Sequence, residues 1–429
     1  MMQPSPACRS CGGSALKSII DLGHTPLANG LLTRDQLDQP EATYPLKLVF
    51  CSDCTLVQIT ETVPPEQMFD EYFYRSSYSD TMLDHARALV NKLVQRRKLG
   101  HNNLVMEVAS NDGYLLQYYQ QAGVPVLGIE PAKNIAAIAR NERGIPTISE
   151  YFGAELAGRM SASGERADVI HAHNVLAHVP DLNGFAKGLG LLLKSDGVAV
   201  IEVPYVKDMI DRCEFDTIYH EHLCYFSLTA LATLFQQHGL ALLNVERLTI
   251  HGGALRIEVG KDNSERTGQL PDRKPPDQSV AAGGETSTVD RMLKAEAEWG
   301  VGSMDFYSGF GANVERLRRD LTGLLQRLKS EGKRIAVYGA SAKGSTLLNC
   351  FGIERETLEF VVDRSDIKQG HYTPGLHLPI YAPDKLLETK PEYTLLLTWN
   401  FADEVLAQQA EYRRRGGQFI IPVPEVRIV

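Results

Sequence analysis

The stretch LVMEVASNDGYLLQYYQQAG, residues 104–123, decides the fold class of this chain. A short apolar run, Leu104 to Val108, meets a tight polar turn, Ala109 to Gly113, and a helical pattern follows. A second apolar run, Val126 to Ile129, ends in Glu130 and leads into another helical pattern. This order predicts a β-α-β unit with an acidic residue at the end of its second strand.

The first turn of this unit suits a ligand other than a dinucleotide. In doubly wound sheets that bind nucleotides, the acidic residue accepts hydrogen bonds from a ribose, and the first turn lets the backbone approach the ligand. The turn has one glycine, Gly113, and lacks the repeated glycines of the pyrophosphate-binding sequence G-x-G-x-x-G. An adenosyl ligand without phosphates is therefore the better expectation.

Two later apolar runs extend the pattern. The run ADVIHAHNVLAHV ends its expected strand in the polar pair His173 and Asn174, and the run VAVIEVPYV carries Glu202 among apolar residues. Because burying an uncompensated carboxylate is costly, Glu202 is expected to be paired or to point into a site. In this order the strands and turns resemble the S-adenosylmethionine-dependent methyltransferases of the Rossmann-like class.

Cysteines gather near the start of the chain. Four of the seven form two C-x-x-C pairs, Cys8 with Cys11 and Cys51 with Cys54. Two such turns can offer four thiolates to one ion, which is the tetrahedral sulfur set that zinc prefers. The alternative is two redox or merely buried pairs, and the pattern favours zinc. Since four protein sulfurs leave no open position, the zinc would stabilise a fold and do no chemistry.

Composition limits the classes of function. The chain has 429 residues, 43% of them hydrophobic, and carries 44 Lys and Arg against 53 Asp and Glu, a net charge of −9. This length predicts roughly two to four domains, and this charge gives no diffuse positive field for nucleic acid or anionic lipid. No apolar run reaches the roughly 20 residues of a membrane span, and the start MMQPSPACRS lacks the features of a signal peptide. We expect a soluble, cytoplasmic protein that binds neither nucleic acid nor membrane.

The second half of the chain predicts another nucleotide-type unit. Residues 260–290 are rich in Pro, Gly, Ser, Thr and charge, and helical periodicity resumes from Arg291 to about Ser330. The sequence RIAVYGASAKGSTLLNC then predicts a strand, a turn of small residues with Lys343, and a helix. A later strand closes on Asp363, with Lys368 in the loop beyond it. This half handles a phosphate-bearing substrate or is simply a packed Rossmann-like domain.

The stretch DTIYHEHLCYFSL, residues 216–228, concentrates side chains capable of chemistry. If it is extended, Tyr219 and Glu221 share one face and His220 and His222 the other. Three interpretations remain open: a polar edge strand, a metal site on the two histidines, or general base chemistry by an imidazole with a phenol and a carboxylate nearby. Further along, HGGALR, residues 251–256, is either an ordinary turn or a close approach to a ligand beside Arg256.

The chain as a whole resembles the sugar C-methyltransferase family, three-part enzymes that methylate nucleotide-linked deoxysugars. The resemblance covers nearly the full length. It is carried, in this order, by the paired C-x-x-C, EVASNDGYLL, NVLAHV, YHEH, HGGALR, YGASAKG, DRSDIKQGHYTPG and TWNFADE.

The resemblance implies an α/β protein with three domains. A small zinc-binding domain would span residues 1–68, and a Rossmann-like S-adenosylmethionine-binding methyltransferase domain would span residues 69–259. A linker or long loop would cover residues 260–290. A second Rossmann-like domain, residues 291–429, would help to hold the nucleotide sugar. The cofactors implied are S-adenosylmethionine and a structural zinc, and the chain would be a monomer or a homodimer.

The resemblance also assigns residues to roles. His222 is the expected base, accompanied by Tyr219 and Glu221 of the family's Tyr-x-Glu-His. Residues expected to bind the cofactor are Glu107, Ala109, Ser110, Asn111, Asp112, Gly113, Glu130, Pro131, His173 and Asn174. Residues expected to bind the nucleotide-diphosphate sugar are Glu202, Tyr225, His251, Gly252, Arg256, Lys343 and Lys368.

The implied reaction is methylation at C3 of a 4-keto-6-deoxy sugar. The C4 ketone acidifies the neighbouring C3–H, so His222 can remove that proton while Tyr219 or a water stabilises the enolate oxygen. The carbanion then takes the methyl group from the sulfonium. Two alternatives remain: O- or C-methylation of a non-sugar acceptor, and a non-catalytic zinc-stabilised binding protein.

Overall fold

A seven-stranded sheet lies at the centre of the larger half of the molecule. The computed structural model describes residues 6–65, 68, 76–78, 80–248, 252–262 and 287–429. The strand order is β10-β11-β8-β7-β4-β5-β6; β4 to β8 are parallel, and β8 pairs antiparallel with β11, which pairs antiparallel with β10. The strands are β4 (Val105–Val108), β5 (Val126–Ile129), β6 (Thr147–Ile148), β7 (Ala167–His173), β8 (Leu193–Pro204), β10 (Leu240–Leu248) and β11 (Ala254–Lys261).

Helices connect the parallel strands and cover the sheet. Apolar residues of α2 and α3 pack together with β4 in one buried cluster. Local capping sets two of the helix starts, because the Asp181 carboxylate accepts from Gly184 N at α6 and the Ser227 hydroxyl accepts from Ala230 N at α8. The helices are α2 (Asp80–Arg97), α3 (Leu116–Gln121), α4 (Lys133–Arg143), α5 (Ala154–Ala162), α6 (Leu182–Leu192), α7 (Val206–Asp211) and α8 (Leu228–Gln236). Helix α2 precedes β4 on the chain, and residues 69–75 and 79 lie outside the described part.

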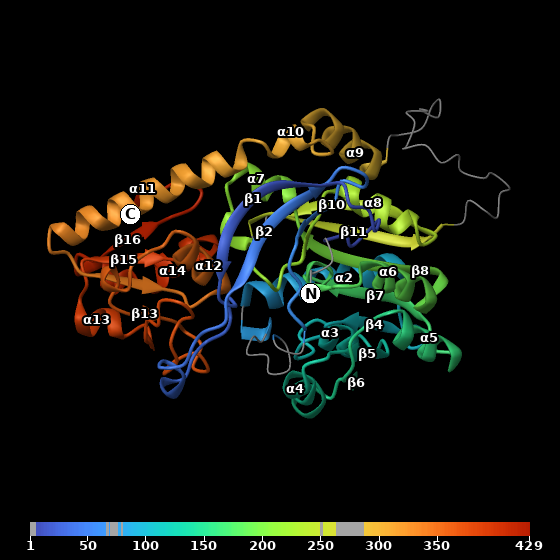
Figure 1. Ribbon diagram of the computed structural model, residues 1–429. Helices are drawn as coiled ribbons and strands as arrows, with labels where there is room; N and C mark the ends of the chain where they lie inside the picture. Colours follow the sequence, from blue (N-terminus) through green and yellow to red (C-terminus); the bar gives the residue numbers. More distant parts are fainter. Residues whose placement is uncertain (1–5, 66–67, 69–75, 79, 249–251, 263–286) are drawn as a thin grey trace.

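The N-terminal part of the chain forms a four-stranded antiparallel sheet. Its order is β1-β2-β3-β9, formed by β1 (Leu16–Thr25), β2 (Tyr44–Cys51), β3 (Val57–Ile59) and β9 (Cys224–Tyr225). The edge strand β9 belongs to the stretch 216–228, so the N-terminal sheet is completed by a strand from the following unit. In Figure 1, β1 and β2 (blue) cross between the two α/β halves of the molecule, and β1 contacts helices of the C-terminal half.

The C-terminal half contains a second doubly wound sheet. Its order is β14-β13-β12-β15-β16-β17, parallel except for the last strand. The strands are β12 (Ile335–Tyr338), β13 (Val361–Val362), β14 (Ile380–Tyr381), β15 (Tyr393–Leu396), β16 (Gln418–Ile421) and β17 (Arg427–Ile428). The helices are α12 (Ala342–Cys350), α13 (Lys385–Thr389), α14 (Ala402–Gln408) and α15 (Ala410–Arg414). The expected α/β architecture with two Rossmann-like units and a small N-terminal unit is confirmed.

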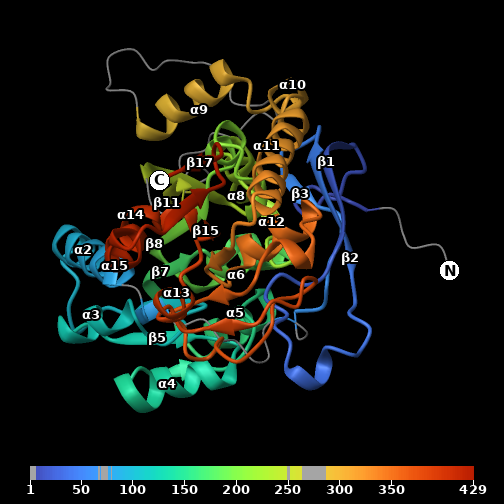
Figure 2. The same ribbon diagram turned by 90° about the vertical axis from the view of Figure 1, so that its left-hand side faces the viewer.

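The expected helical run from Arg291 to about Ser330 is divided into three helices, α9 (Thr288–Trp299), α10 (Met304–Tyr307) and α11 (Phe310–Ser330). Helix α9 contacts α8 and β10, whereas α11 extends along the C-terminal half (Figures 1 and 2). Glu296 on α9 is fully buried and accepts from the Tyr205 hydroxyl at 2.9 Å and from Leu228 N at 2.7 Å. Thus α9, most of which the sequence placed in the unit 291–429, is anchored on the half that contains the seven-stranded sheet.

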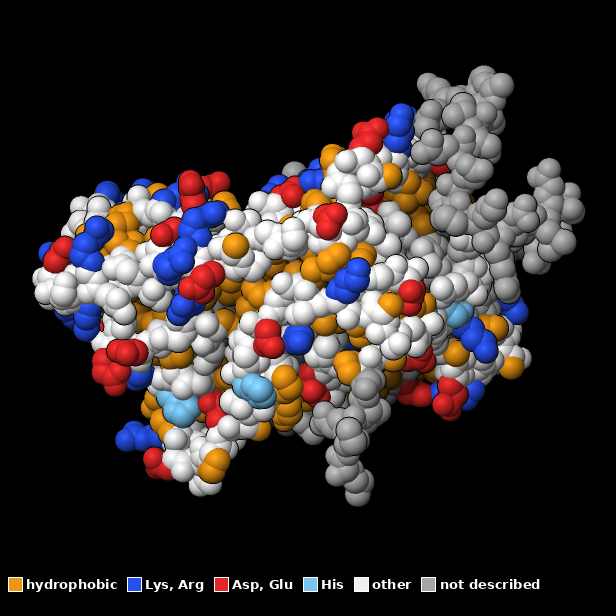
Figure 3. Space-filling model, turned by 45° about the horizontal axis from the view of Figure 1, so that its top comes forward, with side chains coloured by type: hydrophobic (Ala, Val, Ile, Leu, Met, Phe, Trp, Pro, Cys, Tyr) orange, Lys and Arg blue, Asp and Glu red, His pale blue; other side chains and the backbone are white. Residues whose placement is uncertain are grey.

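The surface agrees with the charge balance. On the face shown in Figure 3, acidic and basic side chains are interspersed, without a continuous patch of one sign. No helix in the described ranges combines the length and the apolar character that a membrane crossing requires.

The buried Glu296 carboxylate provides a test of how α9 is attached. Glu296→Ala leaves buried donors without an acceptor, so we expect the free energy of unfolding to fall by about 2–4 kcal/mol. Denaturant titration measures this change. Glu298→Ala, on an exposed position of the same helix, is the matched control and should change stability by less than about 0.5 kcal/mol. Equal effects of the two substitutions would show that Glu296 does not anchor α9.

Candidate active site

The four N-terminal cysteines form a compact sulfur cluster. Their Sγ atoms all lie within 4.8 Å of one another, with Cys8 and Cys54 at 3.3 Å and Cys11 and Cys51 at 3.6 Å. A tetrahedral ion with Zn–S bonds of about 2.3 Å would separate neighbouring sulfurs by about 3.8 Å, so this set fits zinc. Within the described residues, this is the one group of His, Cys, Asp and Glu close enough to hold a metal.

The turn after β4 has an unusual backbone. Ala109, Asn111 and Gly113 all have positive φ, at 53°, 50° and 77°. The left-handed conformation is costly for the two residues with side chains, so the surrounding contacts must impose it. A Cβ on Gly113 would lie 2.9 Å from Ile145 Cγ1, which makes glycine necessary here for space as well as conformation.

Glu130, which follows the neighbouring strand β5, is hydrogen-bonded to the backbone of this turn. Its carboxylate accepts from Asn111 N and from Ala132 N, each at 2.9 Å. Burial raises the pKa of Glu130 to about 7, partly offset by these two backbone donors. The acidic residue at the end of the second strand is therefore buried beside the first turn, and Pro131 follows it on the chain.

Polar atoms around this turn fit a ligand. Glu107 Oε2, Ser110 Oγ and Asp112 Oδ1 are buried without a hydrogen-bond partner among the described residues. Burial, with the nearby charges of Asp112 and Glu130, raises the pKa of Glu107 well above its ordinary value. Buried polar groups are normally satisfied, so this cluster suits a polar ligand such as S-adenosylmethionine.

The third strand adds the remaining predicted cofactor residues. His173 ends β7, which is paired with β4, and Asn174 follows with a φ of 53°. The carboxyl ends of parallel strands meet at one edge of a sheet, and ligands of such folds bind there. The structure therefore brings the ten predicted cofactor residues to adjacent strand ends.

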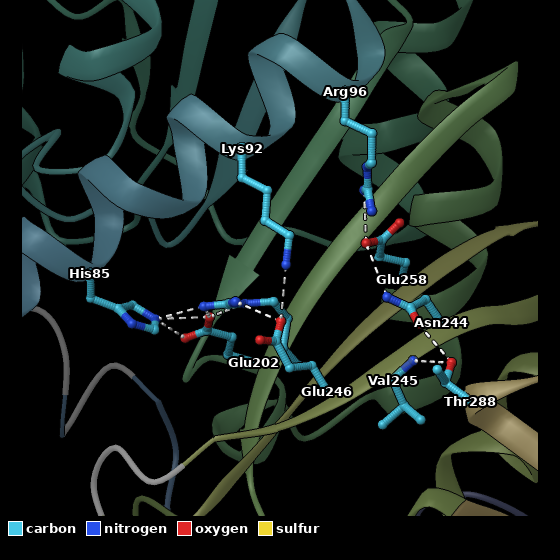
Figure 4. A network of polar contacts seen from close by, with 10 residues as sticks. His85, Lys92, Arg96, Glu202, Asn244, Val245, Glu246, Glu258 and Thr288 are labelled. Atoms are coloured by element: carbon cyan, nitrogen blue, oxygen red, sulfur yellow. Dashed lines mark hydrogen bonds and ion pairs between the residues drawn. The ribbon is translucent and has the colours of Figure 1, made fainter. Parts of the chain in front are cut away.

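Glu202 and Arg256, both predicted to bind substrate, are bonded to each other. They lie opposite on the antiparallel pair β8 and β11, and Arg256 Nε donates to Glu202 Oε1 at 2.6 Å. His85 Nε2, on α2, lies 3.0 Å from the same oxygen, and Arg256 also donates to Glu246 at 3.0 Å. Figure 4 shows His85, Lys92 and Arg96 reaching from α2 toward these strands. Of the two alternatives for Glu202, the structure shows the paired one.

The network continues inward through two histidines that sequence reasoning did not connect. His173 Nδ1 lies 3.2 Å from Glu202 Oε2, His171 Nδ1 lies 2.8 Å from His173 Nε2, and Tyr119 Oη lies 2.9 Å from His171 Nε2. Burial alone would raise the pKa of Glu202, but the charges of His173 and Arg256 and the contact with His85 hold it well below its usual range. A hydrogen bond from His173 Nδ1–H to Glu202 would leave His173 Nε2 to accept from His171 Nδ1–H, and His171 Nε2 to accept from the Tyr119 hydroxyl.

The stretch around Tyr219 is a turn, so the expected alternation of side chains along a strand is wrong. His222 N donates to Tyr219 O at 2.9 Å, and this turn folds the two side chains together. Tyr219 Oη lies 2.9 Å from His222 Nε2, and His222 Nδ1 lies 2.9 Å from Thr217 O. Extended structure begins only at Cys224, where β9 pairs with β3. His220 points elsewhere and contacts Pro45 O at 3.2 Å, so the structure does not support a metal site on the two histidines.

A second imidazole, His178, faces this pair. Its ring packs edge-on against that of His222, with centroids 4.8 Å apart. Burial lowers the pKa of His178 to about 4. Burial, followed by the charges of His178 and Lys343, lowers the pKa of His222 well below its ordinary value. In the sequence, His178 was marked only as part of the motif NVLAHV. Its contact with His222 could not be predicted, because the two residues lie far apart on the chain.

Residues of the C-terminal half surround the same stretch. Trp399 Nε1 donates to the fully buried Asp216 at 2.6 Å, and Lys343 Nζ lies 4.7 Å from the centroid of the Trp399 ring. Lys343 Nζ is buried and has no hydrogen-bond partner among the described residues. Lys368 Nζ, in contrast, donates to Ala340 O at 2.7 Å.

The remaining predicted substrate residues have different surroundings. The Tyr225 hydroxyl donates to Thr217 O at 3.2 Å. A Cβ on Gly252 would lie 2.6 Å from Glu214 Oε2, so this glycine allows close approach between two parts of the chain itself. His251 lies outside the described residues.

The sulfur cluster predicts a metal-dependent fold at the N-terminus. The purified protein should contain about one zinc ion per chain, and Cys51→Ser should lose it and lower the melting temperature by about 10 °C or more. Elemental analysis and thermal unfolding provide the measurements. Cys350→Ser, outside the cluster, is the control and should keep the metal. A metal-free Cys51→Ser variant with an unchanged melting temperature would contradict a structural role.

Family models match three consecutive parts of the chain. A zinc binding domain matches residues 8–69, a methyltransferase domain matches residues 80–245, and a C-methyltransferase C-terminal domain matches residues 249–424. Among solved structures, magnesium protoporphyrin IX methyltransferase (ChlM) from Synechocystis PCC 6803 with bound SAM is 13% identical with a TM-score of 0.33, and the match covers 42% of this chain and 79% of that chain.

Two curated proteins are similar to different extents. The ubiquinone biosynthesis O-methyltransferase of Bartonella quintana is 25% identical over 100 residues, 23% of this chain and 40% of that protein. The C-methyltransferase NovU of Streptomyces niveus is 34% identical over 429 residues, 100% of this chain and 98% of that protein. This full-length similarity and the three matched models show that the chain belongs to the C-methyltransferases, as an S-adenosylmethionine-dependent enzyme with an N-terminal cysteine cluster.

Proposed function

We propose that this enzyme methylates C3 of a nucleotide-linked 4-keto-6-deoxy sugar, with His222 as the base. The observation that carries the proposal is the Tyr219–His222 pair, in which two contacts set the protonation of the imidazole. The order of motifs that resembles sugar C-methyltransferases supports the choice of substrate class.

The contacts of His222 identify Nε2 as the ring nitrogen that can act as the base. The Thr217 carbonyl can only accept a hydrogen bond, so Nδ1 carries the ring proton and Nε2 keeps its lone pair. Tyr219 then donates its hydroxyl proton to Nε2. Since burial keeps the imidazole neutral at pH 7, Nε2 is free to take up a proton from a carbon acid once substrate displaces this hydrogen bond.

The surroundings favour negative charge on the substrate. A C3–H next to a C4 ketone loses its proton to give an enolate, and the Tyr219 hydroxyl can donate to the oxygen on which the charge develops. The Lys343 ammonium, whose charge is one of the causes that lower the pKa of His222, contributes positive potential to the same region. At the first turn of α12 it can also serve the phosphates of a nucleotide diphosphate.

The donor site supports the same reaction. The turn from Ala109 to Gly113 and the Glu130 carboxylate would hold S-adenosylmethionine, which supplies an electrophilic methyl group on a sulfonium when it is bound. Glu130 would accept from ribose hydroxyls, as acidic residues at this strand end do in nucleotide-binding sheets. The chain's own residues then need only to remove the C3 proton and to hold the sugar in line.

Solvent exchange separates proton removal from methyl transfer. In deuterated water with S-adenosylhomocysteine in place of the donor, the enzyme should exchange C3–H of a thymidine-diphosphate 4-keto-6-deoxy sugar for deuterium. His222→Ala should slow this exchange by about 100-fold or more, and NMR of the sugar follows it. His101→Ala, on an exposed histidine, is the control and should leave the exchange rate unchanged.

Exchange that survives His222→Ala would refute the role of His222. Product analysis by mass and NMR tests the acceptor atom: a methyl group on oxygen, or on a non-sugar acceptor alone, would replace the proposal with one of its alternatives. Binding of S-adenosylmethionine without turnover of any 4-keto sugar would favour a non-catalytic binding protein.

A further inference from the structure

We propose that Asn29, in the N-terminal part of the chain, is a positioning residue that orients the Glu221 carboxylate within the active site and favours its ionised form. The proposal rests on the proposed function in one respect, because it takes Glu221 to belong to the catalytic Tyr-x-Glu-His. It adds a residue from a different domain to that site.

The contact itself is short and specific. Asn29 Nδ2 donates to Glu221 Oε1 at 2.6 Å, across a large separation in sequence. Glu221 is only 6% exposed, whereas Asn29 is exposed, so the hydrogen bond joins an exposed residue to a buried carboxylate. An amide N–H can only donate, and a hydrogen bond from it is stronger to a carboxylate than to a neutral carboxylic acid.

The ionisation of Glu221 is balanced near neutral pH. Burial raises the pKa of this carboxyl to about 7, and the Asn29 hydrogen bond, followed by the charge of Lys368, opposes the rise. His178 also faces this residue, through a hydrogen bond to the Glu221 backbone, and Tyr219 and His222 flank it on the same turn. Asn29 is thus the neutral donor, and Lys368 the cation, that favour the charged form.

The loop that carries Asn29 is also bonded to the C-terminal half of the molecule. Between β1 and β2, Leu32 exchanges two backbone hydrogen bonds with Tyr372 of the C-terminal half, at 2.9 Å and 2.8 Å. Nearer β2, Glu41 accepts from Gly375 N at 2.9 Å and lies 3.1 Å from His377 Nε2. These anchors let a residue of the N-terminal part keep a constant position beside a residue of the central part.

A graded pair of substitutions distinguishes electrostatics from shape. Removing the donor in Asn29→Ala should raise the pKa of Glu221 by about one unit, since the donor favours the carboxylate. Asn29→Asp keeps the shape but replaces the donor with a negative charge, so it should raise this pKa further. The acidic limb of the kcat–pH profile should move to higher pH in the same order.

Infrared difference titration measures the ionisation directly. The carboxyl band that is present in the wild type and absent in Glu221→Gln reports this residue, and its midpoint is followed in each variant without any substrate. Gln39→Ala removes an exposed amide of the same loop and keeps the Glu41 anchor, so it should leave the midpoint where it is in the wild type. Thermal unfolding confirms that each variant is folded.

Three outcomes would overturn the proposal: a midpoint unmoved in both Asn29 variants, a smaller shift in Asn29→Asp than in Asn29→Ala, or a shift in Gln39→Ala equal to that in Asn29→Ala. The titration is independent of the reaction. A midpoint that moves as expected in an enzyme that exchanges no proton of a 4-keto sugar would refute the proposed function and leave the effect of Asn29 on Glu221 established.

Discussion

The structure depends on how the chain pairs the carboxylates that it buries between Glu214 and His222. Asp216 is fully buried and receives its hydrogen bond from Trp399 of the C-terminal half, while Glu221 receives one from Asn29 of the N-terminal part. An uncompensated buried carboxylate costs several kcal/mol, so each of these donors matters to stability. The packing of the N-terminal and C-terminal parts against the central stretch therefore also sets the environment of its titratable groups.

Burial acts in opposite directions on the two kinds of titratable group in this stretch. It raises the pKa of Glu221 to about 7 and lowers the pKa of His222 well below its ordinary value. The same exclusion of water therefore supplies a neutral imidazole and leaves a carboxyl whose charge is set by its neighbours. Lys343 and Lys368 enter from the C-terminal half, which lets one domain influence both groups.

Local patterns in the sequence predicted the parts of the molecule that local forces determine. The strand and turn around Gly113 follow from periodicity and turn chemistry, and the sulfur cluster follows from the spacing of the C-x-x-C pairs. The faces of Tyr219 and His222 were predicted wrongly, since a turn replaces the expected strand. The contacts of His178 and Asn29 were missed for a different reason: each joins residues that are distant in sequence, and a single sequence carries no record of such proximity.

The pairing of β9 with β3 has a consequence for the order in which the molecule can form. During synthesis, the N-terminal strands leave the ribosome long before Cys224 and Tyr225 do, so β3 is an open edge until the central unit has been made. An open edge can pair with other chains, and contacts between distant residues form slowly. A metal bound by the four cysteines would hold the early strands together during that interval. The cluster would then stabilise the nascent chain before the finished enzyme exists.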